Sequence, residues 1–65
     1  MLMTVYDDRL KGKLAAVAAD IAIFHGWSEK NLEETAAKVG VTYGKAKSLF
    51  PRGGIDLARF YHQLK

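Results

Sequence analysis

The 65-residue chain contains no cysteine, one proline and no apolar run long enough to span a bilayer. Without cysteine it can form no disulfide framework and perform no thiol chemistry, which fits the cytoplasm. Charged side chains follow too soon after the first residue for a secretory signal, so we expect none. No segment alternates apolar and polar residues as a half-buried strand would. These absences argue against a secreted disulfide scaffold, a membrane-spanning protein and a β-rich fold.

The residues that are present are those of a small globular domain. Hydrophobic residues make up 49% of the chain and charged residues 26%. We expect one domain over residues 1–65, with an all-α fold of four helices. A chain of this size buries only about 60% of the surface that it exposes when unfolded, so we expect a marginal core.

The charge is unevenly distributed. Residues 1–41 carry five basic and six acidic side chains, a net charge of −1, whereas residues 42–65 carry five basic and one acidic, a net charge of +4. The C-terminal third is therefore suited to phosphates or to an acidic partner. The alternative is an ordinary solvated face.

Apolar periodicity predicts helices at about 7–25, 28–39, 43–50 and 54–63. Asp7 and Asp8 suit the start of the first helix, and Gly26 suits its C-terminal cap. The predicted inward residues are Leu10, Leu14, Val17, Ile21 and Phe24 in the first helix, Leu32, Ala36 and Val39 in the second, and Leu57, Tyr61 and Leu64 in the fourth.

Short polar residues mark the other helix starts. Ser28 is a candidate N-cap for the second helix, although Asn31 with Glu34 has roughly the spacing of a capping box and allows a later start. Thr42 is the candidate N-cap of the third helix. Pro51 ends that helix, because the residue before a proline is disfavoured in helical geometry.

Residues 32–50 have the pattern of a helix-turn-helix. Ala36 is small enough for a close helix crossing, and Gly40, four residues later, tolerates the positive φ that such a turn needs. The alternative is two ordinary helices joined by a glycine turn. The exposed face of the second helix of this motif would offer candidate nucleic-acid or anion contacts from Thr42, Tyr43, Lys45, Lys47 and the adjacent Arg52. This face has no Asn or Gln for base reading, so we expect weak, sequence-independent binding to nucleic acid.

The order of the helices resembles the N-terminal domain of TetR-type transcriptional regulators over roughly residues 10–61. Those regulators usually carry Tyr and then His just before the Phe that ends the third helix, where this chain has Lys47 and Leu49. A DNA-binding domain of a TetR-type regulator is therefore the alternative interpretation.

A closer resemblance rests on two blocks, F-H-G-W-S at 24–28 and L-F-P-R-G-G-I-D-L at 49–57, followed by F-Y-H at 60–62. They resemble the ubiquinone (coenzyme Q) biosynthesis accessory family, the ninth of the Coq proteins, in its alphaproteobacterial type. The resemblance implies a TetR-like helix-turn-helix fold without DNA binding, a homodimer, and a bacterial cytoplasmic location that becomes peripheral to the membrane within a larger protein.

In that family a C-terminal helical domain binds lipid and presents substrate to a demethoxyubiquinone hydroxylase. The lipid site lies beyond the part that the resemblance covers, so we expect residues 1–65 to be the N-terminal part of a larger protein with a structural, protein-contact role. No lipid-site residue can be carried over to this chain.

No arrangement of side chains suggests an enzyme. We expect no catalytic residues, no cofactor and no metal site, because the two histidines, His25 and His62, lie on different predicted helices without further ligands nearby. Phe60 and Tyr61 are adjacent and cannot both face one core, so one of them would be exposed, and with Leu64 they form a candidate protein interface at the end of the last helix. The alternative is partial burial of both at the helix end.

Overall fold

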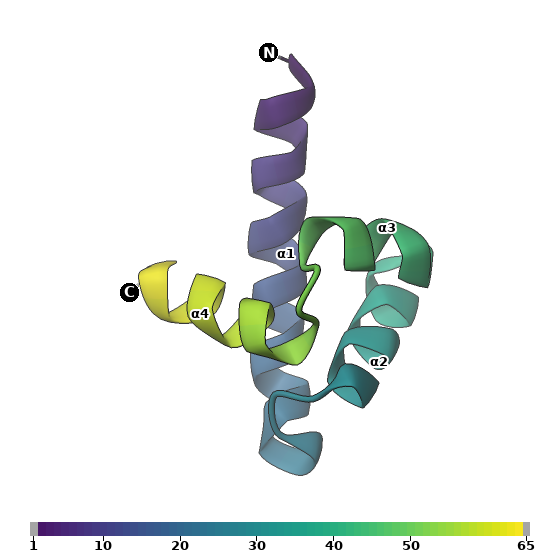
Figure 1. Ribbon diagram of the computed structural model, residues 1–65, viewed down its shortest axis with the longest axis vertical. Helices are drawn as coiled ribbons and strands as arrows, with labels where there is room; N and C mark the ends of the chain where they lie inside the picture. Colours follow the sequence, from purple (N-terminus) through teal and green to yellow (C-terminus); the bar gives the residue numbers. More distant parts are fainter. Residues whose placement is uncertain (1, 65) are drawn as a thin grey trace.

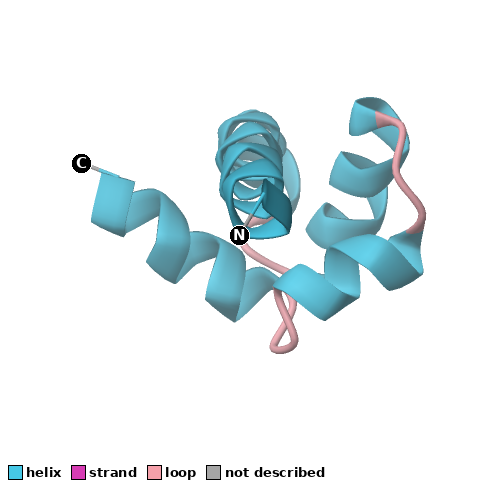
Figure 2. Ribbon diagram, turned by 90° about the horizontal axis from the view of Figure 1, so that it is seen from above, coloured by secondary structure: helices cyan, strands magenta, loops and turns pink. Residues whose placement is uncertain are grey.

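The computed structural model describes the backbone of residues 2–64 and the side chains of residues 7–63. Within this part there are four helices and no strand: α1 (Leu2–His25), α2 (Glu29–Val39), α3 (Tyr43–Leu49) and α4 (Gly54–Leu64). The long α1 is the central element; α2 packs on one side of it and α4 on the other, and the short α3 connects these two (Figure 1; Figure 2). The all-α prediction and the number of helices are confirmed.

The predicted caps of the second and third helices form. The Ser28 hydroxyl accepts a hydrogen bond from the Asn31 backbone N–H at 3.2 Å, and the Thr42 hydroxyl accepts one from the Lys45 backbone N–H at 3.0 Å. Gly40 adopts φ 92° after α2, and its N–H donates to the Ala36 carbonyl at 2.9 Å. The later start at Asn31 is wrong, because that residue lies inside α2.

The start of α1 differs from the prediction. The helix begins at Leu2, not near Asp7, since no glycine or proline interrupts residues 2–7. Asp7 therefore lies beyond the first turn. It is held there by a partner 38 residues away in sequence, the Lys45 ammonium, at 3.3 Å.

The core lies where α1, α2 and α4 meet. Leu14, Leu32 and Leu57 are fully buried at its centre, and Phe50, at the end of α3, is 2% exposed. Trp27, Val39, Val41, Leu49 and Phe60 pack around this cluster as half-buried residues. None of the helices in the described part is long and apolar enough to cross a membrane.

One predicted core residue is wrong. Phe24 is 83% exposed, although it follows the apolar periodicity of the first helix. It stands at the edge of the apolar stripe that starts at Leu10, and neither α2 nor α4 covers it. Val17, on the same edge, is only half-buried.

Candidate functional site

The two sequence blocks that carry the family resemblance lie against each other. Gly54, at the start of α4, packs so closely on the connection between α1 and α2 that a Cβ there would overlap the carbonyl of Trp27 and the backbone nitrogen of Ser28. Gly53 adopts φ 65°, and a Cβ there would overlap the Glu29 carboxylate. At Gly54 the close backbone contact itself demands glycine, whereas at Gly53 the positive φ does, because the Glu29 side chain can move away.

The turn between α3 and α4 is fixed by its own residues. Phe50 fills the core, and its carbonyl accepts a hydrogen bond from the Gly53 N–H at 2.8 Å. The Arg52 backbone N–H donates to the Asp56 carboxylate at 2.8 Å, which ties the turn to the first turn of α4. Each of these residues therefore has a structural partner.

The candidate interface on α4 consists partly of core-packing residues. Phe60 and Tyr61 are both half-buried. The Phe60 ring lies 5.9 Å from that of Phe50, and the Tyr61 ring lies 5.7 Å from that of Trp27, between ring centroids. Leu64 lies outside the residues whose side chains are described. Both aromatics can be half-buried because Phe60 packs on Phe50 and Tyr61 packs on Trp27. Their role in an interface stays a prediction.

Asn31 is an organising residue that the sequence analysis missed. Its side chain is completely buried, and its amide nitrogen donates to the carbonyls of Ala18, at 3.0 Å, and Gly26, at 2.8 Å. Its amide oxygen accepts from the Thr35 hydroxyl at 2.9 Å. The network joins α1, its C-terminal cap and α2. The signal was the helical spacing of Asn31 and Thr35 alongside the inward Leu32 and Ala36.

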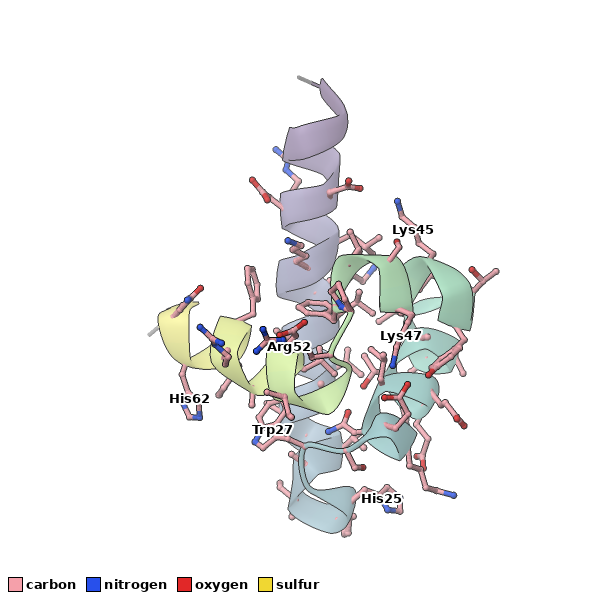
Figure 3. All side chains as sticks on the ribbon, in the orientation of Figure 1. His25, Trp27, Lys45, Lys47, Arg52 and His62 are labelled. Carbon is pink, nitrogen blue, oxygen red and sulfur yellow. The ribbon has the colours of Figure 1, made fainter. Side chains whose placement is uncertain are left out.

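The candidate nucleic-acid contacts gather around α3, and two of the three cations are already paired (Figure 3). Lys45 contacts Asp7 at 3.3 Å, and Lys47 contacts Glu29 at 2.8 Å. Among the described residues no acid pairs with the side chain of Arg52, which is exposed.

The uncharged candidates on this face are limited too. The Thr42 hydroxyl is engaged in the helix cap, although the residue is exposed, and Tyr43 is 40% exposed. The face therefore presents one aromatic, one unpaired guanidinium and two lysines whose charges are offset by carboxylates. This arrangement suits weak contact with phosphates. The only group on this face that could bind a base in a bidentate way is the Arg52 guanidinium, which lies in the turn after α3 and not on the helix.

The histidines do not converge. His25 ends α1 and contacts Glu34 of α2 at 3.0 Å, whereas His62 stands on α4 beside Tyr61, with ring centroids 6.0 Å apart (Figure 3). Within the described part of the chain, no three His, Cys, Asp or Glu side chains are grouped as metal ligands would be.

Comparison of the chain with protein-family models, with curated proteins and with solved structures found no match.

Proposed function

We propose that this chain is a non-catalytic helix-turn-helix domain of the ubiquinone-biosynthesis accessory type, and that it serves as a scaffold and a protein-contact surface. α2, the turn at 40–42 and α3 form the helix-turn-helix, and α1 and α4 complete a TetR-like arrangement. In this proposal the lipid site and the contact with a demethoxyubiquinone hydroxylase belong to a C-terminal domain of the family type.

The observation that carries the proposal is the contact between the two resemblance blocks. Gly54 lies on the backbone of Trp27 and Ser28, so the G-W-S block and the F-P-R-G-G block are two halves of one junction. Residues that meet in space give a reason for the two blocks to occur together in one chain. Because Phe50, Gly53 and Asp56 all serve this junction, the block supports a structural role rather than a chemical one.

The scaffold role is tested in cells by deleting the gene and measuring quinones by mass spectrometry. We expect demethoxyubiquinone to accumulate and ubiquinone to fall. Re-expression of the protein should restore ubiquinone, and so should the Gly12→Ala variant, because nothing lies within 4 Å of a Cβ at that position. The Gly54→Ala variant should fail to restore it. Normal ubiquinone in the deletion strain would contradict the proposal.

The second candidate is the DNA-binding domain of a TetR-type regulator, which the net charge of +4 in residues 42–65 favours. The ion pairs Lys45–Asp7 and Lys47–Glu29 weigh against it, since each carboxylate offsets a cation on the face that would meet DNA. Pairs this exposed are worth about 0–1 kcal/mol, so the lysines are attenuated rather than blocked.

Removing one carboxylate tests this attenuation. Glu29→Gln removes the carboxylate that pairs with Lys47. Glu33→Gln is the control: it removes the same charge one turn further along α2. Glu33 is exposed and has no ion pair among the described residues. We expect Glu29→Gln to raise affinity for a random DNA duplex more than Glu33→Gln, measured by fluorescence anisotropy at low salt. Equal effects would show that only net charge matters and that the pair has no influence on binding.

A further inference from the structure

A groove of about 420 Å³ runs between the C-terminal half of α1 and α2, away from the α3 face and from the candidate interface on α4. Val17, Ile21 and Phe24 supply its apolar surface, and Asp20 of α1 and Lys38 of α2 stand beside them. The His25–Glu34 contact bridges the two helices at the end of α1. The volume is within the range of sites that accept sizeable apolar groups.

The groove is bordered by apolar surface that a small domain normally hides. Phe24, which lines the groove, is 83% exposed. A large apolar side chain that lines an open groove and is rimmed by charged residues marks an interaction surface. The charged and apolar residues along α1 indicate which kind of partner covers this groove.

Four residues form one stripe along the outer face of α1. Lys13, Val17, Asp20 and Phe24 follow one another at steps of four, three and four, which is the spacing of a helix–helix seam. Lys13, Asp20 and Phe24 are exposed and Val17 is half-buried. Among the described residues neither Lys13 nor Asp20 has an ion-pair partner, and at seven residues apart on one helix they stand two turns from each other.

The charges of the stripe match those of a second, identical stripe that runs in the opposite direction. We propose that the groove is covered by a second copy of this chain, with the two α1 helices crossing in antiparallel directions near Val17 and Asp20. This crossing brings Lys13 of each copy toward Asp20 and the face of Phe24 of the other, giving two ion pairs and two cation–π contacts. A parallel pairing instead sets Lys13 against Lys13 and Asp20 against Asp20, so the charges select the antiparallel direction.

Charge exchange on the stripe provides the test. Lys13→Asp and Asp20→Lys each place like charges opposite one another in a pair of identical chains, whereas the double variant restores opposite charges. Sedimentation equilibrium from about 10 μM to about 1 mM should show wild-type self-association, weakened about tenfold or more in each single variant and restored in the double variant. Because both positions are exposed, melting curves should show that all variants stay folded.

Mixing the two single variants gives a second readout. Lys13→Asp carries only acids on the stripe and Asp20→Lys only bases, so an equimolar mixture should associate more strongly than either variant does alone. Glu33→Lys, an equally large charge change on exposed α2 surface, is the control and should behave as the wild type.

Three results would overturn the proposal. The first is a wild-type chain that stays monomeric over the whole range, which would leave the groove to a different protein. The second is single variants that associate as the wild type does. The third is a double variant, or a mixture, that fails to recover the association.

Discussion

At the scale of single residues, Asn31 shows how one polar side chain can hold a helix junction. Replacing it with alanine leaves the carbonyls of Ala18 and Gly26 and the hydroxyl of Thr35 without their partner. Each buried group left unpaired costs about 1–3 kcal/mol, so we expect Asn31→Ala to lower the free energy of unfolding by about 3 kcal/mol or more, measured by urea denaturation. Thr35→Val removes only one of these bonds and should cost about 1 kcal/mol. Equal losses in the two variants would contradict the network.

Phe50 is the aromatic residue of the buried core: it is 2% exposed and packs edge-on against Phe60. Phe50→Ala should cost about 3–5 kcal/mol, as truncations of buried aromatics do. In a 65-residue domain this loss should abolish cooperative thermal unfolding, followed by circular dichroism.

Phe24→Ala is the matched control for that measurement. It removes the same atoms from a side chain that is 83% exposed, so the melting curve at low protein concentration should stay within about 0.5 kcal/mol of the wild type. A Phe50→Ala curve close to that of Phe24→Ala would place Phe50 outside the core.

At the scale of elements, two glycines have different roles: Gly54 allows a close contact between backbones, whereas Gly12 only lowers the helix propensity of α1. Gly54→Ala forces a methyl group into the backbone between α1 and α2, and should destabilise the fold by about 3 kcal/mol. Gly12→Ala, within α1, meets no atom within 4 Å and should stabilise the fold by about 0.5–1 kcal/mol, because alanine favours a helix over glycine. Chemical denaturation of both variants measures the difference. Shifts of the same sign would show that α4 does not depend on its close approach to the connection.

The helix ends were predictable because their signals are local. Ser28, Thr42 and Gly40 each act within four residues along the chain, so short-range spacing was enough to predict α2, the turn and α3. The start of α1 was missed because Asp7 has the chemistry of a helix-start residue, although no glycine or proline in residues 2–7 stops the helix from beginning earlier. The partner of Asp7 is Lys45, and a pairing across 38 residues leaves no mark in local spacing.

At the scale of the whole molecule, burial could be predicted only where periodicity and packing agree. Leu14, Leu32 and Leu57 were predicted correctly because every neighbouring helix covers them. Phe24 obeyed the same periodicity and is exposed, whereas the polar Asn31 is buried. Both outcomes depend on where α2 lies along α1, and that placement emerges only when all four helices pack together. The candidate contacts around α3 stay a prediction, and the acids that pair with Lys45 and Lys47 come from α1 and α2, where local spacing gives no sign of them.

The overall charge leads to a last prediction, on nucleic acid. The chain carries a net charge of +3, and two of its candidate contact lysines are offset by Asp7 and Glu29. Binding to duplex DNA should therefore involve few phosphates, roughly two or three, so that a plot of log K against log salt falls with a slope of about −2 to −3. Random and defined duplexes should bind alike, because α3 itself carries no Asn, Gln or Arg, and the one guanidinium nearby, that of Arg52, lies in the turn after the helix. Fluorescence anisotropy across a salt series measures the slope. A footprint on one defined operator at physiological salt would contradict the prediction, because such selectivity needs contacts to base edges that remain when salt weakens the contacts to phosphates. That result would favour the transcriptional regulator over the scaffold.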